Sequence, residues 1–178
     1  MFSRLCVSTH GDRAKAIQIV GEGNSAIEPM EPALLRDLEN GKPGGVGWII
    51  HMPLGDNVLL DFPPTGTCIV RVPRVQPAQM ESAFRSLLDQ YGANDQFAVH
   101  REGEQTKTLD AGPGQPGAVK APEDDRRRMD GKLKVHFLVY SMSLPDTGRN
   151  AELVLATTES QAVSIQGTLS FEIAPEKR

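Results

Sequence analysis

The sequence has no long hydrophobic run. Its longest uninterrupted apolar segments, such as residues 137–140, span only a few residues, whereas a membrane-spanning helix needs about 20. It also lacks an excess of positive charge, because 19 Lys and Arg residues stand against 23 Asp and Glu residues, giving a formal net charge of −4. We therefore expect no membrane-spanning segment, and neither nucleic acid nor an anionic membrane as a partner.

Local metal motifs are missing, and the one cofactor-like motif is out of context: residues 21–26 match Gly-x-Gly-x-x-Ala, but Pro29 and Pro32 break the helix that a dinucleotide site would need. The chain has no Cys-x-x-Cys pair, and its histidines (His10, His51, His100 and His136) are too far apart in sequence to form a local ligand motif. No Gly-x-x-x-x-Gly-Lys phosphate loop and no Gly-x-Ser-x-Gly nucleophile elbow is present. We therefore expect no metal and no cofactor.

The chain is long enough for one domain with a substantial core. A domain of 178 residues buries roughly 70% of the surface that its unfolded chain exposes. Hydrophobic residues make up 39% of the chain, slightly less than is usual, and the deficit is local. Residues 103–131 are rich in Gly, Pro and charge and show almost no apolar periodicity, so we expect a single domain, 1–178, with a long loop or excursion at 103–131.

Apolar periodicity predicts an α+β domain. A spacing near 3.6 residues predicts helices, and strict alternation predicts strands. The helices are expected at residues 2–6, 12–21, 31–40 and 77–92, with a strand at 16–20 as the alternative to the second helix. The strands are expected at residues 46–52, 57–62, 68–73, 97–101, 133–140, 151–158 and 163–173. This order indicates a mostly antiparallel sheet of about six to seven strands, with the N-terminal helices and one central helix packed on one face.

Cys6 and Cys68 are the only cysteines. Alternation places Cys68 on the same strand face as Val70 and Val72, and Cys6 shares the apolar side of the first helix with Leu5, so both sulfurs should point inward. A disulfide between them is favoured, which would require an oxidising compartment. Two unrelated buried thiols, or a catalytic or redox-active cysteine, are the alternatives.

The stretch from Cys6 to His10 also permits a nucleophile with its base. A working thiol has to be exposed and electropositive, and apolar neighbours raise its pKa instead. Gly11 and the turn-forming Ser8 and Thr9 further interrupt a helix that would carry Cys6 and His10 on one side. We therefore favour a structural cysteine and a surface histidine.

Four residues are candidate ligand-binding residues: Trp48, His51, His136 and Tyr140. Alternation places both histidines on the solvent side of their strands, where they could share a sheet face and meet. The simpler interpretation is that they are exposed sheet histidines with no shared role. No catalytic residue is assigned.

Part of the chain resembles a known family. A Phe and a Cys in an N-terminal helix (FSRLCVSTHGD), a Gly-Trp near residue 48 (GGVGWII) and a second Cys opening a strand (TGTCIVRV) resemble the NMCC family, a set of small uncharacterised exported proteins of proteobacteria. The resemblance covers residues 2–92. It implies a cleaved signal or lipoprotein anchor in the precursor, a periplasmic location and a Cys6–Cys68 bridge, but no catalytic residues. Residues 103–131 are where the chain would depart from these relatives.

Together these features favour a small, non-enzymatic, exported domain. It would bind a protein, an envelope component or a small ligand through a sheet face or its long loop. A cysteine-dependent hydrolase or redox enzyme using Cys6 and His10 is the alternative. Residues 1–5 lack the charged and then apolar segments of a signal peptide, as would a chain whose signal had been removed. The expected location is therefore periplasmic or secreted, with the cytoplasm as the alternative.

Overall fold

The protein forms one eight-stranded antiparallel sheet with helices on both of its faces. The computed structural model describes residues 2–21, 26–39, 41–53, 57–94, 97–110, 132–145, 147–160 and 163–174. In chain order the elements are η1 (Ser3–Val7), α1 (Arg13–Gly21), β1 (Ile27–Pro29), α2 (Pro32–Leu38), β2 (Val46–Ile50), β3 (Val58–Phe62), β4 (Cys68–Val72), α3 (Pro77–Gly92), β5 (Val99–Asp110), β6 (Lys132–Leu144), β7 (Arg149–Thr157) and β8 (Gly167–Ile173).

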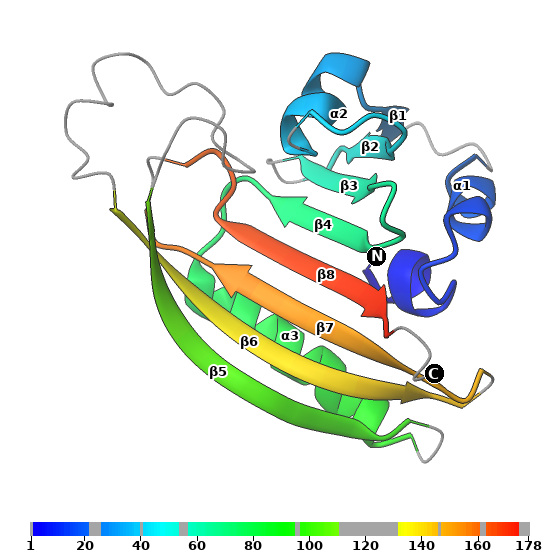
Figure 1. The fold of residues 1–178 in the computed structure, drawn as a ribbon, viewed down its shortest axis with the longest axis vertical. Helices are drawn as coiled ribbons and strands as arrows, with labels where there is room; N and C mark the ends of the chain where they lie inside the picture. The colour runs from blue at the N-terminus through cyan, green and yellow to red at the C-terminus, as the bar shows by residue number, and fades with distance from the viewer. Residues whose placement is uncertain are drawn as a thin grey trace.

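The sheet consists of two meanders joined edge to edge. Its strand order is β1-β2-β3-β4-β8-β7-β6-β5, so each half follows the chain and the halves meet where β4 pairs with β8. Helix α3 makes the long connection from β4 to β5 and lies behind the β5–β8 half in Figure 1. The expected α+β class with a mostly antiparallel sheet is confirmed, with eight strands in place of six or seven.

The main core lies on the sheet face covered by α3, which we call the α3 face. Cys68, Phe171, Leu153 and Tyr140 are successive register partners on this face, and the first three are 0% exposed. Phe84 of α3 packs edge-on against Tyr140 at 5.6 Å between ring centroids. Segments η1 and α1 add their apolar side chains to the same core. Alternation in the strands and the 3.6-residue spacing in α3 therefore meet in one apolar layer.

Helix α2 lies on the opposite face, so the expectation that all helices share one face is wrong for α2. Gly47 alternates with Trp48 and thus points away from the α3 face. A Cβ at Gly47 would lie 3.1 Å from side-chain atoms of both Leu35 and Met30. The missing side chain lets α2 pack closely over β2.

Strand β6 changes its buried side part-way along. Leu133 and Val135 are buried on the face opposite α3, whereas Leu138 and Met142 are buried on the α3 face. The register with β7 is continuous, so the change in buried side is not caused by a bulge. The expectation that one alternate set of side chains faces the core along residues 133–140 is therefore wrong beyond His136.

The edge strand β5 is longer than the sequence indicated. It covers Val99–Asp110, with an irregularity between Arg101 and Gly103. The expected loop is therefore wrong for residues 103–110, while residues 111–131 lie outside the described residues. Strand β1, which was not expected, adds three residues at the other edge.

Candidate functional site

A row of small and polar residues crosses the α3 face near the start of α3. Thr106, His136, Thr157 and Gly167 are register partners on β5, β6, β7 and β8. A Cβ at Gly167 would collide with the Met80 sulfur of α3. The first turns of α3 therefore lie close to the sheet at β8 and form one wall of a pocket over the rest of the row.

The pocket has a volume of about 490 Å³. Eight of its nine lining residues are of polar or charged type, although their apolar atoms supply most of the exposed lining: Pro77, Glu81, Thr106, Lys134, His136, Thr157, Thr158, Glu159 and Ser160. Two carboxylates, one ammonium, one imidazole and four hydroxyls thus surround one opening.

His136 lies between two carboxylates at the floor of this pocket. Its Nδ1 is 2.7 Å from Glu81 Oε1 on α3, and its Nε2 is 3.2 Å from Glu104 Oε1 on β5. Thr157 donates a second hydrogen bond to the same Glu81 oxygen at 3.1 Å. Ionised carboxylates only accept hydrogen bonds, so both contacts are satisfied when the imidazole carries a proton on each nitrogen.

Two arginines form ion pairs with the second carboxylate oxygen of Glu104, the one that His136 does not contact. Arg85 Nη2 lies 3.5 Å from Glu104 Oε2, and Arg101 forms an ion pair with the same oxygen. Arg85 also donates a hydrogen bond to the Tyr140 hydroxyl at 3.2 Å. This network links α3 to β5 and β6, so the side chains at the pocket floor are held in place by partners on three elements.

The rim beyond β7 is also fixed. Thr158 donates to the Lys134 carbonyl at 2.8 Å and accepts a hydrogen bond from the Ser160 amide at 3.2 Å. Glu159, between them, is exposed, as is Lys134. Charges of both signs therefore meet at the rim.

The four candidate ligand-binding residues separate into two pairs. His136 and Tyr140 lie on the α3 face within the network described above. Trp48 packs against Phe62 on β2 and β3, with 6.2 Å between ring centroids. His51 follows β2, where it contacts Asn57 at 3.0 Å and Glu28 at 3.3 Å. Four strands separate β2 from β6, so the two histidines do not meet, and the less favoured of the two interpretations is excluded.

Glu81 and Glu104 were not identified from the sequence as site residues. Glu81 lies outside the apolar stripe of the helix expected at residues 77–92, and Glu104 falls within the loop expected at 103–131. One signal was present: Glu81 and Arg85 are four residues apart, beside the apolar stripe of Met80, Phe84 and Leu88. Side chains at that position on a helix border the surface that packs on a sheet.

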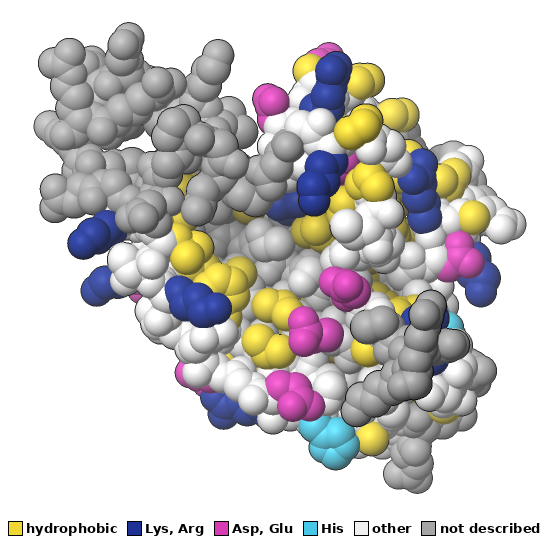
Figure 2. Space-filling view, viewed as in Figure 1, with side chains coloured by type: hydrophobic (Ala, Val, Ile, Leu, Met, Phe, Trp, Pro, Cys, Tyr) yellow, Lys and Arg dark blue, Asp and Glu magenta, His cyan; other side chains and the backbone are white. Residues whose placement is uncertain are grey.

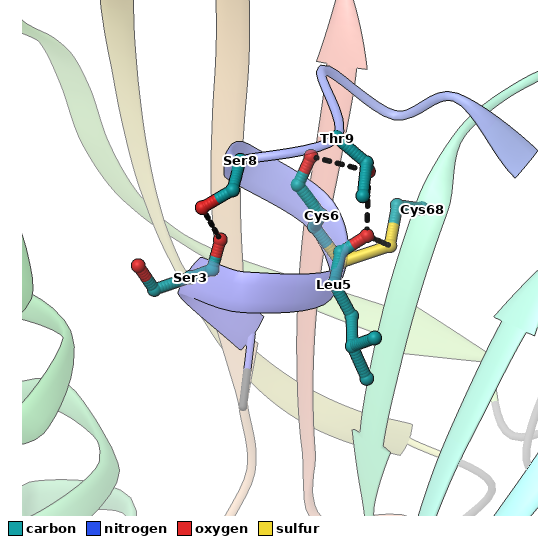
Figure 3. The surroundings of a disulfide bond; sticks show 6 residues. All are labelled: Ser3, Leu5, Cys6, Ser8, Thr9 and Cys68. Atoms are coloured by element: carbon teal, nitrogen blue, oxygen red, sulfur yellow. Dashed lines mark hydrogen bonds between the residues drawn. A yellow bond between two sulfur atoms is a disulfide. The ribbon is translucent and has the colours of Figure 1, made fainter. Parts of the chain in front are cut away.

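Cys6 and Cys68 form a disulfide, which confirms the favoured interpretation. Their Cα atoms are 5.5 Å apart across a separation of 62 residues, and both side chains are 0% exposed. The helical turn ends at Val7, and Thr9 donates to the carbonyls of Leu5 and Cys6 at 2.7 and 3.3 Å (Figure 3). His10 has a left-handed backbone with φ of 53°. Cys6 and His10 thus do not share one continuous helix, and Cys6 is not a free thiol.

A second group of charges is buried on the face opposite α3. Arg71 donates two hydrogen bonds to Asp61, at 2.8 and 3.0 Å. Burial raises the pKa of Asp61 above its usual 3.8, although Arg71 acts in the opposite direction. Burial also raises the pKa of Glu39 above 4.5, and the carboxylate of Asp61 raises it further. Glu39 Oε1 is buried without a hydrogen-bond partner. Because the pocket does not include these residues, we interpret this group as structural.

The face opposite α3 also carries apolar side chains in the β5–β8 half. Phe137, Val139, Val154 and Ala156 are half-buried there, and the Lys107 ammonium lies 5.6 Å from the Phe137 ring centre. Figure 2 views this face, with hydrophobic side chains beside several acidic ones. The patch is part of an ordinary, partly wet sheet face.

In the part of the chain that the structure describes, no group of three or more His, Cys, Asp or Glu side chains is arranged to hold a metal ion. None of the described helices is both long and apolar enough to cross a membrane. No protein-family model, curated protein or solved structure compared with the chain matches it. The site is therefore interpreted from its own chemistry.

Proposed function

We propose that this chain is an exported, non-enzymatic domain, stapled by the Cys6–Cys68 disulfide, that binds a small polar ligand in the pocket between α3 and strands β5–β7. The observation that carries the proposal is the pocket itself. Its volume of about 490 Å³ falls in the range of small-molecule sites, roughly 300–1,000 Å³.

The pocket is also held in shape by its own contacts. A chain of contacts runs from Glu81 on α3 through His136 on β6 to Glu104 on β5. Arg85 and Arg101 form ion pairs with Glu104 at the end of this chain. Side chains that are already fixed lose less conformational freedom when a ligand binds, so more of the contact energy remains as affinity. This order supports binding at the pocket rather than on the open sheet face.

Export is supported by the disulfide. Disulfides persist in oxidising compartments and are rare in the cytosol, and this one is fully buried. The test is to denature the protein from source cells directly in an alkylating reagent, without and with reductant, and then to measure its mass. Neither cysteine should be labelled until reductant is added. Two labelled cysteines without reductant would contradict the proposed location and would restore Cys6 as a candidate nucleophile.

Ligand binding is tested by blocking the pocket. Thr106→Trp would place an indole on the pocket floor from an exposed position of β5, and Gln105→Trp places the same group on the opposite face of the same strand. A library of amino acids, amines, organic acids, sugars and nucleosides is screened by thermal shift. At least one compound should raise the Tm of the wild type and Gln105→Trp but not of Thr106→Trp. Shifts that persist in Thr106→Trp, or no shift with any compound, would refute binding at this pocket.

A further inference from the structure

We propose that the ligand of this pocket is dipolar: a small molecule with an ammonium and a carboxylate group, such as an amino acid or a short peptide. The inference rests on the proposed function and specifies the chemistry of its ligand. Glu81 receives the ammonium, and Lys134 receives the carboxylate.

Glu81 presents a fixed carboxylate to the pocket. His136 and Thr157 both bond to its Oε1, at 2.7 and 3.1 Å, and its side chain is 21% exposed. An ionised carboxylate has about four acceptor positions, of which the contacts among the described residues use two. A ligand ammonium, with three donors, can use the remaining capacity without displacing His136. Glu159 adds a second negative charge at the rim.

Lys134 supplies the opposite charge from the same face of the sheet. It precedes His136 by two residues on β6, so its side chain leaves the strand about 7 Å away on the same face. Its ammonium takes part in none of the ion pairs recorded among the described residues. The separation along the strand leaves room for a ligand between the positive and negative groups.

Ligands of a single charge match this lining less well. A purely anionic ligand would meet Glu81 and Glu159, and a purely cationic one would meet Lys134; like charges brought together weaken binding. The lining contains no Phe, Tyr or Trp ring on which an apolar or planar ligand could stack. A dipolar ligand satisfies both signs at once.

The test is a matched series of probes measured by calorimetry. Glycine, β-alanine, 4-aminobutanoate and 6-aminohexanoate vary the charge separation, while hexylamine and hexanoate each carry one of the two charges. The best amino acid should bind at least tenfold more tightly than either single-charge probe, a difference of about 1.4 kcal/mol.

Two variants assign the charges. Lys134→Met should weaken the best amino acid about tenfold but should strengthen hexylamine, because it removes a like charge, whereas Glu81→Gln should weaken both. Lys107→Met and Glu152→Gln change exposed residues on the opposite face and should leave every affinity unchanged. Circular dichroism checks that each variant is folded. Because Lys134 is exposed and its ammonium is not part of the His136 network, Lys134→Met tests the charge without disturbing that network.

The outcomes separate this inference from the proposed function. If hexylamine binds as tightly as any amino acid and Lys134→Met has no effect, the pocket is a cation site and the dipolar ligand is refuted while ligand binding stands. The same holds if only a sugar or nucleoside from the library binds in a manner blocked by Thr106→Trp. If neither the probes nor the library bind at the pocket, both proposals fail.

Discussion

Arg71 and Asp61 form a two-bond ion pair beneath α2, on the face of the sheet that does not contact α3. The bonds measure 2.8 and 3.0 Å, and the side chains are 7% and 0% exposed. With water excluded, each group depends on the other for compensation of its charge.

Removing one partner of this pair should destabilise the fold strongly. We expect Arg71→Met to lower the free energy of unfolding by about 3–5 kcal/mol, since Asp61 is left buried without its partner. Urea denaturation measures the change. Glu28→Gln, which breaks the exposed contact with His51, is the control and should change stability by no more than about 0.5 kcal/mol. Equal effects of the two substitutions would show that Asp61 gains water or another partner.

Glu39 should make the protein less stable as the pH rises. Its pKa is raised in the folded state, first by burial and then by Asp61, so the folded protein binds more protons than the unfolded chain above pH 4.5. Stability is therefore greatest below that value and falls as the pH rises through the folded-state pKa. Glu39→Gln should flatten this slope and raise stability at pH 7.

The measurement is a series of denaturation midpoints between pH 4.5 and 7.5 for both proteins. Glu152→Gln, at an exposed position, serves as the charge-matched control and should run parallel to the wild type. Parallel curves for wild type and Glu39→Gln would mean that the Glu39 carboxylate is solvated in solution. Because the pKa of Asp61 is also raised, part of the slope should remain in Glu39→Gln.

The closeness of α3 to β8 depends on Gly167. Gly167→Ala would place a methyl group against Met80 and Val75, and overpacking of this kind costs roughly 1–3 kcal/mol. Gly92→Ala, at the end of the same helix with nothing within 4 Å of the added carbon, should be neutral or slightly stabilising. Thermal denaturation of the pair distinguishes a packing effect from loss of glycine. A neutral Gly167→Ala would show that α3 can shift without cost.

Loss of the disulfide should cost more than loss of a single core contact. For a closed loop with a separation of 62 residues, the chain-entropy estimate is about 4 kcal/mol. The Cys6→Ser/Cys68→Ser double variant should lose this much stability relative to the oxidised protein and should be insensitive to reductant. If the wild type is equally stable with and without reductant, the bridge does not lower the conformational entropy of the unfolded chain by the amount that this estimate assumes.

The sequence indicated most strands because one face of each is apolar. Alternation located β2, β3, β4 and β8 to within a few residues, and it placed Cys68 inward, from which the disulfide followed. Strand β1 was missed because its three residues, Ile27–Pro29, are too few to show a period. The outer part of β5 was missed because both of its faces are wet. An edge strand with polar residues on both sides has the composition of a loop.

The pocket was only partly predictable for a related reason. His136 was selected as a candidate on the assumption that it faced solvent, but β6 changes its buried side at that residue. Its carboxylate partners lie 55 and 32 residues earlier in the chain, on α3 and β5. Sequence periodicity specifies which side of one element is buried, but it does not specify which two elements pack together.

The pairing of β4 with β8 has a consequence for the order of folding. The last strand in chain order lies in the middle of the sheet, so the two meanders cannot join until residues 167–173 have left the ribosome. Before then, the growing chain has two incomplete sheets, whose unpaired edge strands can pair incorrectly. The Cys6–Cys68 bridge lies wholly within the first meander and its preceding helices, and it can close before the second meander exists. Assembly of the complete sheet therefore waits for β8, whereas the disulfide does not.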